Sequence, residues 1–206
     1  MSKRFLFWDV DTQADFTYPT GKLYVPGAER MVGNLKRLTD WAAGNGILVI
    51  ASACAHHADD AEFAQYPPHC LVGTAGQQKI PETRLPDALV VPNRGVELPT
   101  DLLQHQQIVI EKQQLDVFTN PNTETLLKRL GTDYEIVLYG VVSEICVARA
   151  ARGLLGRGYQ LRIVTDAIRH LDEAKAQKFL EEAAKSGAKL VTSSEVIAGA
   201  SPQRAA

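Results

Sequence analysis

Cys146 occupies a position in this chain that suggests chemistry. It follows the apolar run 137–139 and a turn at Gly140, so the sequence places it in the first turn of a helix. A helix start directs unpaired backbone N–H groups and the positive end of the helix dipole at such a thiol, which favours the reactive thiolate. The alternative is a small buried residue that only packs. Cys146 is therefore a candidate nucleophile.

Two charged residues occupy related positions. Asp11 follows the apolar run 5–10, and Lys112 follows the run 107–110. The carboxyl ends of parallel strands line the crevice where α/β proteins bind ligands, so both side chains could share that crevice with Cys146. A carboxylate, an ammonium and a thiol can act as base, charge partner and nucleophile in acyl transfer. The alternatives are a capping Asp11 and a surface Lys112, but their joint placement favours catalysis.

The turn before Cys146 also supplies donors for a developing oxyanion. Backbone N–H groups at a strand-to-helix turn point toward the helix start, and those of Val142 and Cys146 are the candidates. A thiolate that attacks a carbonyl needs such preorganised donors, because negative charge moves onto the carbonyl oxygen. We therefore expect the oxyanion hole of the enzyme at Val142 and Cys146.

A second cluster of reactive side chains lies in the long segment 52–99. Cys54 and His56 alternate along an extended stretch, which puts both side chains on one side, and His69 follows the rigid sequence 66–68. Together with Glu62 they offer the sulfur, nitrogen and oxygen ligands typical of zinc sites. The alternative is an exposed polar loop. The spacing predicts a metal pocket.

The elements that position these residues alternate between strands and helices. Six short, mainly apolar runs without regular polar alternation predict strands that are buried on both faces. Helical spacing of apolar residues, with proline near a start and glycine past an end, predicts helices between them. We therefore predict an α/β fold with a mostly parallel sheet of about six strands. The predicted strands are 5–10, 47–51, 107–110, 135–139, 160–164 and 189–192, and the predicted helices include 28–45, 120–131 and 172–186.

Composition limits the class of protein. The chain has 206 residues, 45% of them hydrophobic, which fits a single domain over residues 1–206 with a long active-site loop region at 52–99. A formal net charge of −2 gives no electrostatic reason to expect nucleic acid or membrane as a partner. The apolar run 5–8 is too short for a signal peptide, which suggests a cytoplasmic protein. Three cysteines argue against a disulfide framework.

Three segments in this order resemble the isochorismatase-like cysteine hydrolases, and among them the nicotinamidases. Residues 11–16 resemble the opening aspartate motif of that family, residues 111–118 its lysine segment, and residues 140–147 its cysteine motif. The resemblance implies a Rossmann-like three-layer α/β/α sandwich and a catalytic triad of Asp11, Lys112 and Cys146. It also implies a cis peptide between Val141 and Val142, which would turn the Val142 N–H inward. Family habit suggests a homo-oligomer.

The long segment resembles the nicotinamidase metal site, which implies a divalent metal, zinc being the expected ion. His56 and His69 match that site, and Glu62 falls where some members have a glutamate ligand. Cys54 departs from it, because the family normally has aspartate there. A thiolate suits softer metals than a carboxylate, so the exchange would alter metal preference, or leave the site without a metal. Asp60 is a spare ligand candidate, and Cys70 is expected to pack.

The resemblance implies cysteine-dependent hydrolysis of a small aromatic amide such as nicotinamide, through a thioester and with release of ammonia. Phe16, Val141 and Val142 are the expected substrate-binding residues, and Asp15 is expected to orient the loop of Asp11. Two alternatives remain, an isochorismatase-type vinyl-ether hydrolase and a catalytically altered binding protein. The further aromatic candidates for an apolar slot are Trp8, Tyr18, Tyr24 and Phe118, and the histidines without an assigned role are His57, His105 and His170.

Overall fold

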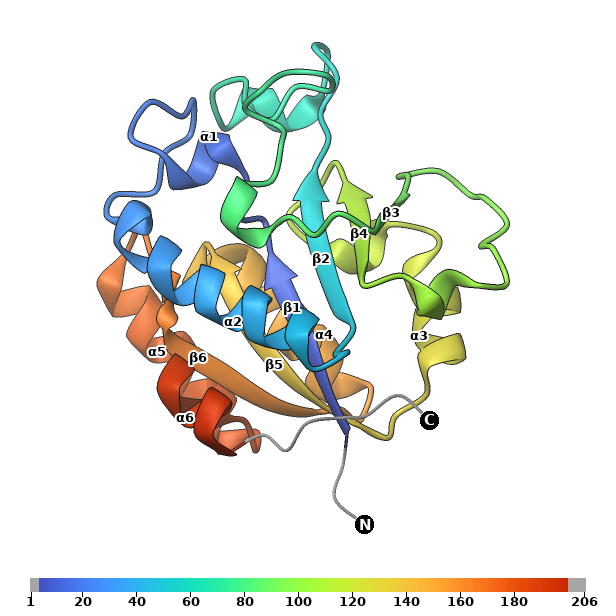
Figure 1. Ribbon diagram of the computed structural model, residues 1–206. Coiled ribbons are helices and arrows are strands. Elements are labelled where there is room, and N and C mark those ends of the chain that lie inside the picture. Colours follow the sequence, from blue (N-terminus) through green and yellow to red (C-terminus); the bar gives the residue numbers. More distant parts are fainter. Residues whose placement is uncertain (1–3, 200–206) are drawn as a thin grey trace.

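The computed structural model describes residues 4–199, so both ends of the predicted domain, residues 1–3 and 200–206, lie outside the described part. Within it, seven strands form one sheet in the order β3-β4-β2-β1-β5-β6-β7, and every neighbouring pair is parallel (Figure 1). The strands are β1 Arg4–Val10, β2 Val49–Cys54, β3 Ala88–Val91, β4 Gln107–Lys112, β5 Tyr134–Val141, β6 Gln160–Arg169 and β7 Lys189–Val191.

Helices cover both faces of this sheet, which confirms the predicted three-layer arrangement. One apolar cluster joins the sheet to α2 and α6, and a separate cluster joins its other face to α3, α4 and α5. The short helix α1 follows β1 directly. The helices are α1 Ala14–Thr17, α2 Val32–Gly44, α3 Thr123–Leu130, α4 Ala148–Gly156, α5 Glu173–Lys185 and α6 Ser193–Gly199.

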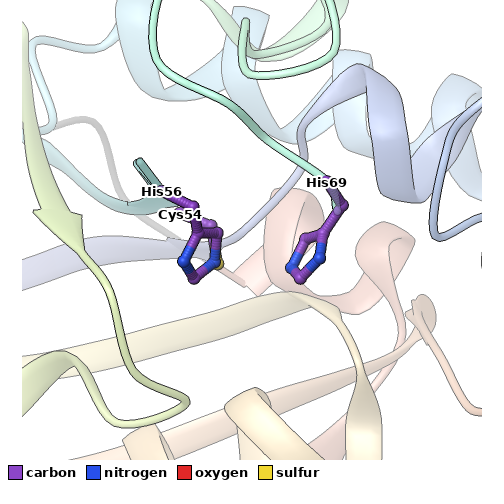
Figure 2. Close-up of side chains that lie close together, drawn as sticks. All are labelled: Cys54, His56 and His69. Carbon is purple, nitrogen blue, oxygen red and sulfur yellow. The ribbon is translucent and has the colours of Figure 1, made fainter. Parts of the chain in front are cut away.

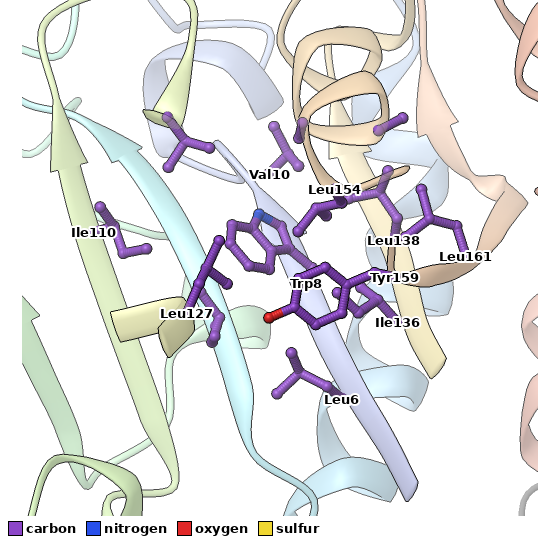
Figure 3. Close-up of a cluster of buried hydrophobic side chains, with 14 of the residues drawn as sticks. Leu6, Trp8, Val10, Ile110, Leu127, Ile136, Leu138, Leu154, Tyr159 and Leu161 are labelled. Carbon is purple, nitrogen blue, oxygen red and sulfur yellow. The ribbon is translucent and has the colours of Figure 1, made fainter. Parts of the chain in front are cut away.

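The central strand β1 shows why these apolar runs form a buried sheet. Leu6 and Trp8 belong to the cluster under α3, α4 and α5 (Figure 3). Phe5 and Phe7 belong to the cluster under α2. Successive side chains of a strand point to opposite faces, so a strand covered on both faces carries apolar residues toward both of them. The prediction that these runs are buried on both sides is confirmed for β1, but it is wrong for β7, where Lys189 and Leu190 are exposed.

Several sequence-based element boundaries differ from the structure; the predicted strand 160–164, for example, continues to Arg169 in β6. The predicted loop region 52–99 begins inside β2 and contains a seventh strand, β3. This strand has only four residues, lies at the edge of the sheet, and leaves Val90 about half exposed, so it carries no long apolar run. The predicted helix 28–45 begins as a 3-10 turn, Ala28–Met31, before α2.

The strand order fixes where a ligand can bind. The chain leaves β1 to build one half of the sheet through β2, and later returns to the other side of β1 with β5. Connections diverge at this point, which opens a crevice at the carboxyl ends of these strands. Gly140 lets β5 pass this close to β1, because its φ is 119° and a Cβ there would collide with the backbone of Val10.

Among residues 4–199, no helix combines the length and the apolar character needed to cross a membrane.

We expect Leu138→Ala to lower the free energy of unfolding by about 2–5 kcal/mol, because it removes a fully buried side chain from the cluster under α4. Urea denaturation followed by circular dichroism measures this change. Leu190→Ala is the matched control, since Leu190 is 43% exposed, and it should cost less than about 0.5 kcal/mol. Equal losses in the two variants would contradict the described core.

Candidate active site

Asp11 and Lys112 form a buried ion pair at the carboxyl ends of β1 and β4. Lys112 Nζ lies 2.9 Å from Asp11 Oδ2, and both side chains are 1% exposed. The hydroxyl of Ser52 donates a 2.6 Å hydrogen bond to Asp11 Oδ1, and the Asp11 N–H donates to the Ser52 carbonyl. Asp11 has a φ of 51°, a left-handed conformation that is unusual for a residue other than glycine. These contacts hold its carboxylate in one orientation.

Cys146 lies beside this pair, 3.8 Å from Lys112 Nζ to Sγ. It belongs to a π-helical turn, Ser143–Val147, that connects β5 to α4, so the cysteine is in the first turn of the helical segment as predicted. The arrangement brings a thiol, a carboxylate and an ammonium into one cluster. Such a cluster can pass a proton from the thiol to the carboxylate while the lysine keeps the charged form of the carboxylate in place.

The electrostatics of Cys146 differ from the prediction. A helix start was expected to favour the thiolate, but burial raises the pKa of the Cys146 thiol well above its ordinary value. Lys112 opposes this shift, whereas the negative charge of Asp11 adds to it. The prediction of a readily ionised thiol in the free protein is therefore wrong, because burial, the largest effect, and the charge of Asp11 both raise its pKa.

For Lys112, the neighbouring groups outweigh the effect of burial on the pKa. Burial lowers it, but the negative charge of Asp11, together with the neighbouring sulfurs of Cys146 and Cys54, raises the pKa of Lys112 well above its ordinary value. The ammonium therefore stays charged in a site that is almost closed to solvent. A fixed positive charge between a carboxylate and a sulfur favours proton transfer that leaves the sulfur negative.

The turn before Cys146 contains the cis peptide that the resemblance implied, between Val141 and Val142. Val142 and Cys146 both line a mainly apolar cavity of about 380 Å³, open mouth included. Val141 is 1% exposed and lies outside this lining. The carbonyl of Val142 accepts hydrogen bonds from the N–H groups of Ile145 and Val147, which fixes the turn.

The cavity accounts for one of the five aromatic candidates. Phe16 is part of its lining, and its ring lies 5.2 Å from that of His69. Trp8 is in the core and Phe118 stacks under Arg157, whereas the hydroxyls of Tyr18 and Tyr24 bind Glu82 and Glu29. The residues that line the cavity are Phe16, Leu23, Val25, Cys54, Glu62, Tyr66, His69, Leu115, Val142, Ile145, Cys146 and Leu171.

The predicted metal ligands also come together. The ligand atoms of Cys54, His56 and His69 lie within 4.8 Å of one another, and all three residues are buried (Figure 2). Glu62 lies next to them, with Oε1 3.7 Å from Nε2 of His69 and 4.0 Å from Nε2 of His56. A sulfur, two imidazole nitrogens and a carboxylate oxygen make up a donor set that suits a divalent metal.

Outer contacts orient both imidazoles. His56 Nδ1 contacts the Asp60 carboxylate at 2.9 Å, and His69 Nδ1 contacts the Pro67 carbonyl at 2.8 Å, which leaves each Nε2 facing the cluster. His56 Nε2 is buried without a hydrogen-bond partner, as expected of a nitrogen that binds a metal. Burial lowers the pKa of His69, which keeps it in the neutral form that binds metals. Asp60 thus supports His56 from outside.

The remaining residues singled out in the sequence lie outside the cavity lining. Asp15 accepts hydrogen bonds from the backbone N–H groups of Lys22 and Cys70, so it holds together the loops around Phe16 and lies outside the cavity lining. Cys70 is fully buried in an apolar cluster, in agreement with a packing role. His57 lines an open polar depression outside the cavity, His105 contacts Asp87 at 2.7 Å, and His170 is half-buried.

Sequence reasoning missed two residues that hold the site together. Ser52 binds the Asp11 carboxylate, and the side-chain amide of Gln13 binds both the N–H and the carbonyl of Cys54, at 2.7 and 2.8 Å. A period-two signal was present, because Ser52 and Cys54 alternate on β2 with their side chains on the same face. Gln13 gave no such signal, since its partner is 41 residues away. Tyr66 and Leu115, which line the cavity, were also missed.

Comparisons with known proteins agree with this geometry. The Isochorismatase domain family matches residues 9–195. Nicotinamidase from Escherichia coli (strain K12) is 30% identical over 206 aligned positions, which cover 89% of this chain and 92% of that protein. An isochorismatase-like hydrolase from Alkaliphilus metalliredigens superposes with a TM-score of 0.76 at 23% identity, covering 95% of this chain and 98% of the other.

A further solved structure, the pyrazinamidase of Pyrococcus horikoshii in complex with zinc, has a TM-score of 0.73 at 22% identity and covers 92% of this chain and 99% of its own. Fold and site together define a hydrolase of the α/β type with a cysteine beside an aspartate and a lysine. This chain belongs to the isochorismatase family.

Asp11→Asn should make Cys146 more reactive toward iodoacetamide at pH 7, because the Asp11 charge contributes to the raised pKa of the thiol. Each unit of pKa that is lost raises the thiolate fraction about 10-fold. Lys112→Met should have the opposite effect, because Lys112 lowers the pKa of that thiol. Mass spectrometry of the peptide that contains Cys146 gives the alkylation rate. A slower reaction in Asp11→Asn than in the parent protein would contradict this electrostatic description.

Proposed function

We propose that this protein hydrolyses a small aromatic amide such as nicotinamide, through a thioester on Cys146 and with release of ammonia. The observation that carries the proposal is the contact of Asp11, Lys112 and Cys146 at the edge of a mainly apolar cavity. The 30% identity to a nicotinamidase over nearly the full length supports an amide as the substrate class.

The first step is proton transfer from Cys146 to Asp11. Asp11 is buried and oriented by Ser52, and the raised pKa of the thiol keeps the proton on sulfur until the substrate is in place. Sulfur then attacks the amide carbon and forms the C–S bond, while the carbonyl π electrons move onto oxygen. Lys112 stays protonated throughout and keeps the negative charges of this step close to a fixed cation.

Collapse of the tetrahedral adduct completes the acylation. Backbone N–H groups of Val142 and Cys146 are the proposed donors to the oxyanion. Asp11 returns its proton to the amide nitrogen as the C–N bond breaks, so ammonia leaves and a thioester remains. Water, deprotonated by Asp11, then cleaves the C–S bond, which releases the carboxylic acid and returns the proton to Cys146.

The lining of the cavity suits a small, flat substrate. The free space inside this recess is only about 30 Å³, well below the usual range for ligand pockets, and its lining is apolar apart from the catalytic and metal-site residues. Phe16, Tyr66 and Leu115 offer apolar surfaces to a ring. Val141 remains a proposed contact through the peptide it shares with Val142.

A bound divalent metal is part of the proposal, and zinc is the expected ion. Cys54, His56 and His69 would hold it, with Glu62 as a nearby carboxylate ligand. When bound, the metal would supply a Lewis acid beside the cavity, suited to a ring nitrogen of the substrate. The fit rests on the partnerless, buried Nε2 of His56 and on the mixed sulfur and nitrogen donors.

A screen for ammonia release tests the activity. The purified protein should release ammonia from nicotinamide or pyrazinamide faster than from aliphatic amides, because the lining of the cavity is mainly apolar and suits a planar ring. Cys146→Ala should lower kcat by at least about 1,000-fold, since removal of a nucleophile leaves only residual catalysis. Cys70→Ala is the matched control, because that buried cysteine lies outside the cavity lining and should retain turnover. Equal rates for Cys146→Ala and the parent protein would refute the proposal.

Metal removal gives a second prediction. Treatment with a chelator followed by gel filtration should reduce kcat/KM for nicotinamide at least about 10-fold, and added zinc should restore it. His56→Ala should show the lowered rate whether or not zinc is added, because it loses a buried nitrogen ligand. His105→Ala, on the surface away from the cluster, is the control. A rate that is unaffected by chelation in a protein shown to be free of metal would contradict a role for the ion.

The other function classes give different outcomes in the same assays. A vinyl-ether hydrolase needs neither a metal nor a thiol nucleophile, so it would turn over isochorismate and tolerate Cys146→Ala. A binding protein would release no product from either substrate class. The intact cluster of Asp11, Lys112 and Cys146 favours the amide hydrolase. The homo-oligomer and the cytoplasmic location stay predictions.

A further inference from the structure

We infer that Cys54 makes the metal position selective for thiophilic divalent cations such as zinc, cobalt and cadmium, over the oxygen-seeking ions manganese and magnesium. The inference rests on the metal site of the proposed function and is independent of which substrate the enzyme cleaves. It concerns the sulfur of Cys54 and the ligand nitrogens of His56 and His69, which the fold places near it.

The sulfur belongs to the cluster by position as well as by type. Cys54 is the last residue of β2, is 2% exposed, and its Sγ lies within 4.8 Å of the ligand nitrogens of His56 and His69 (Figure 2). The partnerless Nε2 of His56 is an independent sign that the cluster is built for a ligand, because buried polar atoms normally have hydrogen-bond partners.

The backbone of Cys54 is held on both sides. The Gln13 amide pairs with its N–H and its carbonyl, while the neighbouring strand β4 places Lys112 in register with it. Lys112 Nζ donates to the Cys54 sulfur at 3.1 Å. Hydrogen bonds to ligand atoms from outside the coordination sphere orient them, so this sulfur is fixed toward the cluster before any ion arrives.

The donor set then decides which ions bind well. Thiolate and imidazole ligands suit zinc and related soft or borderline ions, whereas magnesium and manganese prefer sites made of carboxylate, carbonyl and water oxygens. Here Glu62 is the carboxylate beside the two imidazoles, and Asp60 is engaged by His56 Nδ1. A single carboxylate gives an oxygen-seeking ion little to replace its hydration shell, while sulfur and two nitrogens serve a thiophilic ion.

Cobalt reports directly on the sulfur ligand. We would treat the full-length protein with a chelator, remove the chelator, and titrate with cobalt while recording the near-ultraviolet absorption. A cobalt–thiolate bond should give a charge-transfer band at one equivalent. Competition experiments with cadmium and with manganese should show that cadmium binds at least about 100-fold more tightly than manganese.

Matched variants assign the band to one cysteine. Cys54→Ser should lose it, and Cys54→Asp should lose it while reducing the preference for cadmium over manganese at least about 10-fold. Cys146→Ser and Cys70→Ser should keep the band, because neither sulfur is in the cluster. A band that survives Cys54→Ser, or an unchanged metal preference in Cys54→Asp, would overturn the inference. Metal binding is measured without substrate, so these outcomes stand apart from a failure of the amidase proposal.

Discussion

The buried ammonium of Lys112 is the interaction on which the site depends. A lysine with 1% exposure loses its hydration, so it needs anionic or polarisable partners close by. Asp11 supplies a carboxylate at 2.9 Å, and the sulfurs of Cys54 and Cys146 lie at 3.1 and 3.8 Å. Buried ion pairs add little net stability, since the cost of desolvation offsets their attraction. The importance of this ion pair lies in the site rather than in stability, because it joins the ends of separate strands into one charged cluster.

Lys112 also connects two sites that the sequence presents as separate. Cys54 is a member of the metal cluster and a hydrogen-bond partner of the lysine that faces Asp11 and Cys146. The last residues of β2 contribute to both sites, because Ser52 binds the Asp11 carboxylate and Cys54, two positions later, belongs to the Cys54, His56 and His69 cluster. The register of β2 against its neighbours therefore positions Asp11 and Cys54 together.

The segment 52–99 forms a wall of the cavity with little regular structure, so buried polar contacts must hold it in place. Lys79 Nζ donates to Asp9 Oδ2 at 2.6 Å and to Thr12 Oγ1 at 2.8 Å, which ties the segment to the end of β1. Asp15 accepts from the Cys70 N–H and anchors the stretch around His69. Each contact joins a polar group to a partner more than 50 residues away, which sequence periodicity cannot reveal.

The sequence by itself determined the class of fold and pointed to Asp11, Lys112 and Cys146, because both signals are local. Apolar runs predict β1, β2, β4 and β5, and polar residues at their carboxyl ends mark the crevice. It could not give β3, whose four edge residues are partly exposed. Only the tertiary structure decided the shape of the cavity and the ionisation of Cys146. The pKa of that thiol depends on burial by distant segments and on the charges of Asp11 and Lys112, so a local rule about helix starts gave the wrong direction.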